Sequence, residues 1–468
     1  MTSVTLSAPS TDRLLKIHTL PLLLLASLAA CSEPELDTRP NVVLIVIDTL
    51  RADKLSSYGF ERDTSPALTR LSERGVQFDS VISQSSWTLP SIGSMLTSQY
   101  PRTLGLYAED AQKLPDSAVT LAEVLKSGGY ATFGITANPN LNIRYNFQQG
   151  FDEYHESVVV FHRPGEDVPE GKLDYKKTAL RTTPDIARAI IKFANKVGDA
   201  RPAFVQVDLM EVHEYFNGKL RRDEYAEFFS DDPSAAYLQM IRQVTDDLEV
   251  LVTQLSSIEG WADTLFIFTS DHGEGLKDHP SVKPSRGHGS LLYKSHVSVP
   301  WIMYNPSWTP KNAHIQQRVR LLDLFPTILD YVGVASPPGV KGVSLMPLVN
   351  GEVTEVAMPE FLMTETSFRE FSKVSVIGDE WQFVENRKPH PGLSDSELQE
   401  WEQTSNGKRT NRIGANGDEA LRMQKYIQAW EAAHPFGEPT LIEEELDDAT
   451  RAQLEAVGYL GGDDANDE

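Results

Sequence analysis

Four apolar runs of this chain each end in side chains that bind metal ions or transfer protons. The pairs of run and residue are Asn41–Ile47 with Asp48, Tyr130–Thr136 with Asn138, Ala203–Leu209 with His213, and Thr264–Ser270 with Asp271 and His272. Each run is continuous enough to be a buried parallel strand. Since ligands of open α/β sheets bind at the carboxyl ends of the strands, we expect these side chains to converge.

Two carboxylates and an imidazole at one sheet edge make a plausible shell for a single divalent cation. These residue types bind Ca, Mg, Mn or Zn, so the identity of the ion stays open. Structural roles for the same residues also stay open: Asp48 and Asp271 as helix caps, and His213 and His288 as surface histidines.

The segment from Ser86 to Thr97 supplies a hydroxyl near this edge. Pro90 suits the first turn of a helix, which puts Thr88 just outside the helix N-terminus, where backbone N–H groups and the helix dipole favour an anion. A hydroxyl there, activated by a metal ion, can act as a nucleophile. The alternative is that Thr88 only caps the helix.

Helices between the strands indicate an α/β fold, with a large, mostly parallel sheet sandwiched between helices. The expected helices are residues 65–75, 119–126, 185–197, 237–255 and 321–332. From about Met358 the pattern changes to short strands at 360–365, 373–377 and 381–385, which predicts a small antiparallel α+β appendage with a helix at 421–433. Residues 394–418 are polar and show no readable chemistry.

The composition narrows the class of partner. The chain has 468 residues and a formal net charge of -24 at pH 7. Nucleic-acid binding needs a basic face, so we expect no nucleic-acid partner. The length suffices for one large α/β domain or two smaller ones.

The single cysteine, Cys31, follows an apolar run, Leu20–Ala30, of signal-peptide length. The sequence Leu28-Ala29-Ala30-Cys31 resembles a bacterial lipobox, in which the cysteine becomes the lipidated first residue of the mature protein. An ordinary cleaved signal peptide is the alternative. We therefore expect a signal peptide at 1–30, a tether at 31–40 and a lipid anchor in the cell envelope facing the periplasm. Ser32 resembles the sorting signal for the outer membrane.

Several ordered motifs together resemble the sulfatase family of the alkaline-phosphatase superfamily. They are Val43–Gly59, Thr88–Thr97, Ser270–Glu274, Gly287–Pro300, Val319–Thr327 and Leu454–Gly461. The resemblance implies an alkaline-phosphatase-like sheet in a catalytic domain at 41–350, with a C-terminal subdomain at 351–468 that completes the fold.

The resemblance also implies a role for each site residue. Thr88 matches the nucleophile and a metal ligand, and the other metal ligands would be Asp48, Asp271 and His272. His213 resembles the histidine that faces the leaving group. His288 stands where sulfatases use a lysine. Either histidine would bind substrate and protonate the leaving oxygen, and Asn138 would bind substrate oxygens.

Three positions depart from the sulfatase pattern. Thr88 cannot become the formylglycine that sulfatases make from cysteine or serine, Ile92 replaces the motif arginine, and Thr49 replaces a second aspartate. A threonine nucleophile is similar to phosphonate and phosphodiester hydrolases, and to transferases of phosphoethanolamine or glycerol phosphate.

The sequence therefore predicts a metal-dependent hydrolase that cleaves a sulfate, phosphate-diester or phosphonate ester through a covalent Thr88 intermediate. The substrate would be an ester of a small molecule, a glycan or a lipid headgroup. Two alternatives stay open: a transferase acting on an envelope lipid or glycan, and an inactive homologue that only binds its ligand.

Overall fold

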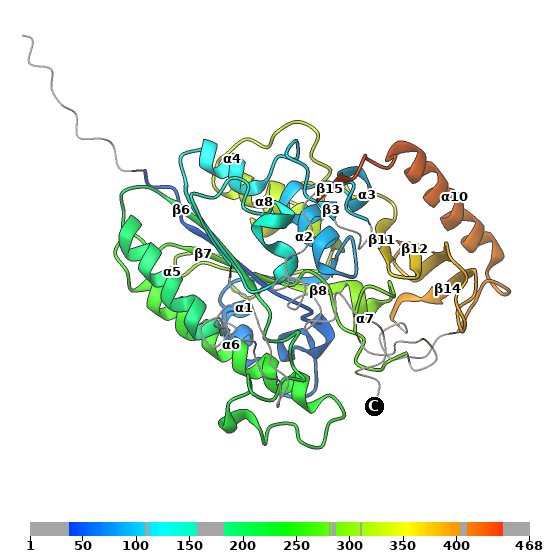
Figure 1. Cartoon of the computed structure of the whole chain (residues 1–468), viewed down its shortest axis with the longest axis horizontal. Helices are drawn as coiled ribbons and strands as arrows, with labels where there is room; N and C mark the ends of the chain where they lie inside the picture. Colours follow the sequence, from blue (N-terminus) through cyan, green and yellow to red (C-terminus); the bar gives the residue numbers. More distant parts are fainter. Residues whose placement is uncertain are drawn as a thin grey trace, which may run out of the picture. The chain divides into compact units, whose positions relative to one another are not determined.

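A computed structural model describes residues 37–107, 112–156, 182–279, 282, 287–308, 311–402 and 410–442 of the chain (Figure 1). The expected signal peptide, Cys31 and the motif Leu454–Gly461 lie outside the described residues. Residues from Asp37 onward form one compact unit. The fold is the expected α/β sandwich with a C-terminal antiparallel sheet.

The large sheet runs in the order β10-β2-β8-β7-β1-β6-β4-β5, with β9 paired to β2. Its strands are β1 (Val42–Ile47), β2 (Val76–Ile82), β4 (Ala131–Thr136), β5 (Glu153–Glu156), β6 (Ala203–Leu209), β7 (Leu265–Thr269), β8 (Ser298–Tyr304), β9 (Ala313–Ile315) and β10 (Val319–Arg320). The strands from β7 to β5 are all parallel, whereas β8 is antiparallel to both β7 and β2. The carboxyl ends of β1, β4, β6 and β7 therefore lie at one edge.

Helices cover both faces of this sheet (Figure 1). One layer contains α1 (Pro66–Ser72), α5 (Thr183–Val197) and α6 (Ala235–Ser256), and the other contains α2 (Thr88–Thr97), α4 (Leu121–Ser127) and α8 (Leu324–Tyr331). Short helices α3 (Pro101–Leu104), α7 (Lys294–Val297) and α9 (Met346–Val349) lie in the connections. Since both faces are covered, the central strands are apolar throughout rather than alternating.

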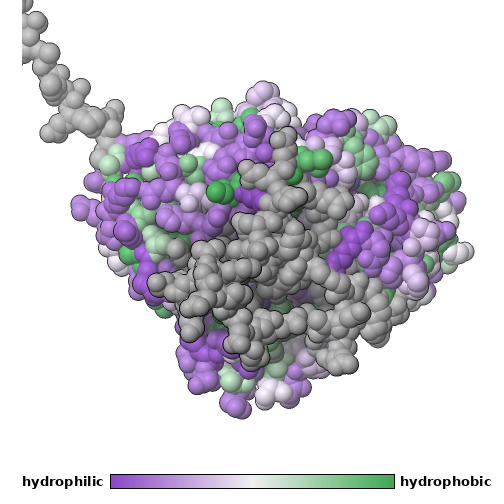
Figure 2. All heavy atoms as spheres, viewed as in Figure 1, coloured by the Kyte–Doolittle hydropathy of each residue, from purple (hydrophilic) through white to green (hydrophobic). Residues whose placement is uncertain are grey.

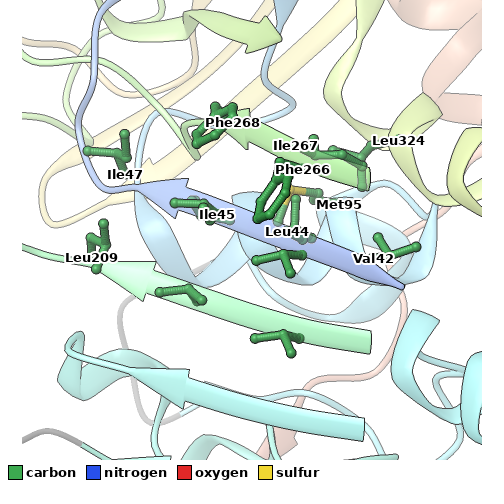
Figure 3. Close-up of a cluster of buried hydrophobic side chains, with 14 of the residues drawn as sticks. Val42, Leu44, Ile45, Ile47, Met95, Leu209, Phe266, Ile267, Phe268 and Leu324 are labelled. Atoms are coloured by element: carbon green, nitrogen blue, oxygen red, sulfur yellow. The ribbon is translucent and has the colours of Figure 1, made fainter. Parts of the chain in front are cut away.

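The core packs around β1, whose six side chains are all buried. Figure 3 shows Leu44 and Ile45 of this strand beside Phe266 of β7 and, on the other side, Leu209 of β6. Met95 projects from α2 into the same cluster. Helix α2 is buried along its whole length, which fixes the position of its first residue, Thr88, against the end of β1.

The antiparallel appendage has one strand more than the sequence predicted. Its four strands, in the order β11-β12-β13-β14, are β11 (Leu362–Phe368), β12 (Phe371–Ile377), β13 (Trp381–Asn386) and β14 (Ser396–Glu400), and α10 (Gly417–Ala433) packs on them. Strand β14 falls in the polar segment 394–418, and its three middle residues are buried although its sequence, Ser-Glu-Leu-Gln-Glu, is mostly polar. A two-stranded pair joins β3 (Gln112–Lys113) to β15 (Thr440–Leu441).

The face of the molecule seen in Figure 2 is mostly hydrophilic, with small scattered apolar areas among the coloured residues. This agrees with the large acidic charge. Within the described ranges, none of the helices combines the length and the apolar character that a membrane span requires.

Candidate active site

Thr88 is the first residue of α2, so it lies inside the helix and not just before it. Trp87 is the N-cap residue, so Thr88 does not occupy the capping position. Ser91, from the same helical turn, donates a hydrogen bond to the backbone oxygen of Asp271 at 2.6 Å. This bond joins the start of α2 to the end of β7, and it gives the motif serine a positioning role.

The structure brings Asp48, Asp271 and His272 together as the sequence predicted. One ligand atom from each residue lies within 4.8 Å of the other two, and all three residues are buried. His272 Nδ1 lies 2.9 Å from the carbonyl oxygen of Gly273, to which it donates when it carries the proton. That bond leaves His272 Nε2 directed at the carboxylates, 3.3 Å from Asp271 Oδ2. Such an outer hydrogen bond is how metal-binding histidines are commonly oriented.

The donor set fits a divalent cation. In the described part of the chain, Asp48 Oδ1 and Asp271 Oδ2 are buried and have no hydrogen-bond partner. Buried acceptors without a partner are costly, and a cation would satisfy both of them. Burial, together with the neighbouring Asp271 charge, raises the pKa of Asp48 to about 7. A cation here would remove this repulsion, so the trio is a credible metal site.

Thr88 and Asn138 complete the metal-binding side of the site. Thr88 Oγ1 lies 3.3 Å from His272 Nε2 and 3.5 Å from Asp48 Oδ2. Asn138 Nδ2 donates to Asp48 Oδ2 at 2.5 Å and to Thr88 Oγ1 at 3.3 Å. The amide therefore holds the hydroxyl and the carboxylate in one place. We call Asp48, Asp271 and His272 the metal half of the site.

His213 and His288 form a row of rings with His272. The ring of His288 is 4.5 Å from that of His272 and 5.1 Å from that of His213, measured between centroids. His213 Nδ1 lies 2.9 Å from Glu214 Oε1. His288 Nδ1 lies 3.6 Å from Glu274 Oε2, beyond ordinary hydrogen-bond length but close enough for an electrostatic contact. We call these two histidines with their glutamates the histidine half.

The two histidines have opposite electrostatic surroundings. Burial opposes the charged form of His213, but Glu214, Asp48 and Glu274 outweigh it and raise the pKa to about 9. Burial and the charge of His272 lower the pKa of His288 to about 4. Two titratable groups whose pKa values are shifted in opposite directions suit a proton donor beside a neutral ring.

The loop after β1 is held in an unusual conformation. Thr49 has a φ of 60°, which is uncommon for a β-branched residue, and it is fully buried. Tyr237 of α6 donates to the Thr49 carbonyl at 2.7 Å, while the Thr49 N–H donates to Asp271 Oδ1 at 3.3 Å. Buried Arg51 also crosses between the loops, with ion pairs to Asp53 at 2.7 Å and Asp278 at 2.5 Å. These contacts fix the two aspartate-bearing loops relative to each other.

Three buried acidic residues of this region were missed from the sequence. Glu214 and Glu274 accompany the histidines, and Asp208 lies near the end of β6. Burial, with smaller contributions from Asp271 and Asp48, raises the pKa of Asp208 to about 8. The sequence could have indicated the two glutamates by their closeness to histidines: Glu214 follows His213 directly, and Glu274 comes two residues after His272.

The C-terminal appendage also reaches this site. Phe368, at the end of β11, lies 5.3 Å from the ring of Trp87 and 6.4 Å from that of His288. Gly289 has a φ of +84°, and a Cβ there would lie 2.6 Å from the Phe368 ring. Thr366 Oγ1 donates to the Gly289 carbonyl at 2.7 Å. The hairpin of β11 and β12 therefore forms one wall beside the histidine half.

Comparison with known proteins defines the class. The sulfatase family model matches residues 40–334, well over half of the chain. The chain belongs to the sulfatase family, as the sequence motifs indicated, and is an ester hydrolase of the sulfuric or phosphoric type.

Individual relatives are distant. The chain is 23% identical over 377 residues to an N-acetylgalactosamine-6-sulfatase of Sus scrofa, covering 72% of this chain and 71% of the relative. It is also 23% identical over 364 residues to an ulvan-active sulfatase of Formosa agariphila, covering 71% and 69% of the two chains.

Solved structures share the fold over nearly all of their length. The enzyme Ps i-CgsB, solved in complex with k-i-k-neocarrahexaose, gives a TM-score of 0.68 at 19% identity, covering 90% of this chain and 97% of that one. The phosphonate monoester hydrolase of Agrobacterium radiobacter gives 0.66 at 18% identity, covering 85% and 96%. The same architecture is thus found in a protein solved with k-i-k-neocarrahexaose and in a phosphonate monoester hydrolase.

Proposed function

We propose that this protein is a metal-dependent hydrolase that cleaves a phosphodiester or phosphonate ester of a small molecule or glycan through a covalent Thr88 intermediate. The observation that carries the proposal is the position of Thr88 Oγ1, within 3.5 Å of His272, Asp48 and Asn138 at the start of a buried helix. An activated hydroxyl needs adjacent groups that stabilise its anion. Asn138 donates a hydrogen bond to it, and the cation that Asp48 and His272 would hold supplies positive charge.

Each residue then has a role that follows from its contacts. Asp48, Asp271, His272 and Thr88 would hold one divalent cation, which when bound lowers the pKa of the Thr88 hydroxyl and polarises the substrate oxygen. Asn138 and the N–H groups at the start of α2 stabilise the negative oxygens that develop as Thr88 attacks. His213 protonates the leaving oxygen, and water afterwards cleaves the Thr88 ester.

The threonine side chain favours phosphorus over sulfur as the reacting atom. Formylglycine, the nucleophile of sulfatases, comes from cysteine or serine, and Thr88 cannot be converted to it. An ordinary alcohol ester must be cleaved by a second in-line attack at the same centre, which positioning and charge stabilisation support well in phosphoryl transfer. The fold similarity to phosphonate monoester hydrolases is consistent with this choice.

A matched substrate panel tests the proposal. The 4-nitrophenyl esters of sulfate, phosphate, a phosphodiester and a phosphonate would be compared with the metal-loaded protein and with the chelated protein. We expect the phosphodiester or phosphonate to be the best substrate and chelation to abolish its turnover. Highest activity on the sulfate ester would overturn the choice of substrate, and full activity after complete metal removal would overturn the metal dependence.

A transferase would give a different result in the same assay. Adding a glycan or lipid-headgroup alcohol would then increase release of nitrophenol and yield a transfer product. For the hydrolase proposed here, we expect nitrophenol and free acid in equal amounts at every acceptor concentration.

We further propose that the mature protein is anchored to the cell envelope by a lipidated Cys31 and faces the periplasm. The lipobox-like sequence Leu28-Ala29-Ala30-Cys31 and the lack of any other cysteine support this. Mass spectrometry of the membrane fraction should find an acylated N-terminal Cys31. An unmodified mature chain in the soluble periplasmic fraction would refute the anchor.

A further inference from the structure

Glu214 is a buried carboxylate beside His213. Its side chain is 0% exposed, and its Oε1 lies 2.9 Å from His213 Nδ1. In the described part of the chain, its second oxygen, Oε2, has no hydrogen-bond partner. Burying a carboxylate is unfavourable unless its interactions compensate for the lost water. With this one side-chain contact, Glu214 lowers the free energy of unfolding.

We propose that Glu214 is a positioning residue that fixes the tautomer and orientation of His213 for proton donation to the leaving group. This inference rests on the proposed function, because it assumes that His213 is the general acid. When the Nδ1 proton is held by Glu214, the proton that can be transferred is the one on Nε2. The carboxylate also stabilises the ring in its charged form before transfer.

The contacts of His213 place its ring on the reacting side. Its ring lies against that of His288, which lies against His272, and His272 Nε2 is 3.3 Å from Thr88 Oγ1. Glu214 belongs to the segment that follows β6. Because His213 and Glu214 are both buried, their packing limits the motion of each side chain.

Glu211 offers a matched control in the same segment. It is also buried, and it also has an oxygen, Oε1, without a hydrogen-bond partner in the described part of the chain. Its other oxygen accepts bonds from the backbone N–H of Thr183, at 2.6 Å, and from the Thr183 hydroxyl. It therefore holds the N-terminus of α5 and, among the described residues, has no ion pair with a histidine. A glutamate-to-glutamine change at either position replaces one buried carboxyl group of this segment by an amide.

The test compares two phosphonate esters that differ only in leaving group, 4-nitrophenol and a simple alkyl alcohol. The nitrophenolate anion is stable and leaves without a proton, whereas the alkoxide requires one. The steady-state kcat/KM of both esters would be measured on the metal-loaded wild type and on Glu214→Gln, Glu211→Gln and His213→Ala.

We expect Glu214→Gln to lower kcat/KM for the alkyl ester by about 10–100-fold, as for other residues that orient a functional histidine. The nitrophenyl ester should be affected far less. His213→Ala should show the same selectivity with a larger loss, up to the roughly 10²–10⁴-fold that a general acid contributes. Glu211→Gln should change both esters by the same factor.

The possible failures are distinguishable. Equal loss on both esters in His213→Ala would show that His213 is not the acid, which refutes that part of the proposed function. Selective loss in His213→Ala without selective loss in Glu214→Gln would refute the positioning role alone. Selective loss in Glu211→Gln as well would show that any buried charge change in the segment has this effect, which also refutes it.

A measurement on the wild type covers the case in which Glu214→Gln does not fold. Nitrogen NMR of the metal-loaded protein with labelled histidine, assigned with His213→Ala, reports which ring nitrogen of His213 carries a proton. We expect Nδ1 to be protonated at neutral pH. An unprotonated Nδ1 would overturn the inference whatever the variants do.

Discussion

The two halves of the site differ in how far the protein's own residues pair their buried polar groups. In the metal half, Asp48 and Asp271 each keep a buried oxygen without a hydrogen-bond partner in the described residues, and burial with like charge raises the pKa of Asp48 to about 7. In the histidine half, each ring faces a glutamate: His213 faces Glu214 at 2.9 Å, and His288 faces Glu274 at 3.6 Å.

This difference indicates how the site works. The metal half has unfavourable electrostatics on its own and becomes stable when a cation supplies the missing charge. The histidine half is already oriented by protein carboxylates. Changes in the two halves should therefore separate experimentally: the first should alter metal content, and the second should alter proton transfer at constant metal content.

The largest effect is expected at Thr88, whose hydroxyl lies against Asp48 and His272 of the metal half. Thr88→Ala removes the attacking oxygen, so turnover should fall by at least about 10³-fold, as when other covalent nucleophiles are removed. Because Trp87, and not Thr88, is the N-cap residue of α2, the thermal unfolding temperature should change little. Thr88→Ser keeps the hydroxyl and should retain part of the activity.

Near-normal turnover of Thr88→Ala on the best ester of the panel would mean that water attacks directly. The covalent mechanism would then be wrong, and Thr88 would be only a further polar contact of the metal half.

Asp271→Asn should disable the metal half. Loss of an outer-shell partner typically costs about 10–100-fold in metal affinity or activity, so loss of a ligand should cost at least as much. Bound metal, measured by elemental analysis after gel filtration, should fall together with turnover.

Asp208→Asn is the matched control for Asp271→Asn. Asp208 is buried at the same sheet edge, but its raised pKa, about 8, keeps its carboxyl mostly protonated at pH 7. An amide resembles a protonated carboxyl, so metal content should stay close to that of the wild type. Equal metal loss in both variants would show that general acidity, and not the Asp48, Asp271 and His272 trio, binds the ion.

Phe368→Leu should have the smallest effect and should act on the histidine half. The change removes the aromatic contacts with Trp87 and His288, each worth about 1 kcal/mol beyond simple burial. We expect a small decrease in thermal stability and a modest decrease in kcat, with unchanged metal content. Loss of metal in this variant would show that the two halves do not respond separately.

The positions of the site residues were largely predictable because strand ends are predictable. Buried apolar runs identify parallel strands, and parallel strands bring their following residues to one edge, which places Asp48, Asn138 and Asp271 together. Thr88 was placed one residue too early, outside the helix, because Pro90 suits any position of the first turn and does not fix where the turn begins.

Other features depend on packing that the sequence does not display. Whether Glu214 faces solvent or His213 is decided by the fold of its segment, and a glutamate beside a histidine is common on surfaces. Strand β14 was missed because its buried positions include Glu397 and Gln399. Glu397 accepts a hydrogen bond from Tyr293, far away in the sequence, and another from the Gln399 side chain. The wall formed by Phe368 requires the appendage to reach the catalytic helix, which no local pattern indicates.

The stereochemical outcome at phosphorus tests the central claim, covalent attack by Thr88, most directly. A chiral phosphorothioate diester would be hydrolysed by the metal-loaded protein in isotopically labelled water, and the configuration of the product would be determined. Attack by Thr88 followed by attack by water gives two in-line inversions, so the account predicts net retention. Net inversion would show that water attacks the substrate in a single step, and it would contradict the covalent role of Thr88.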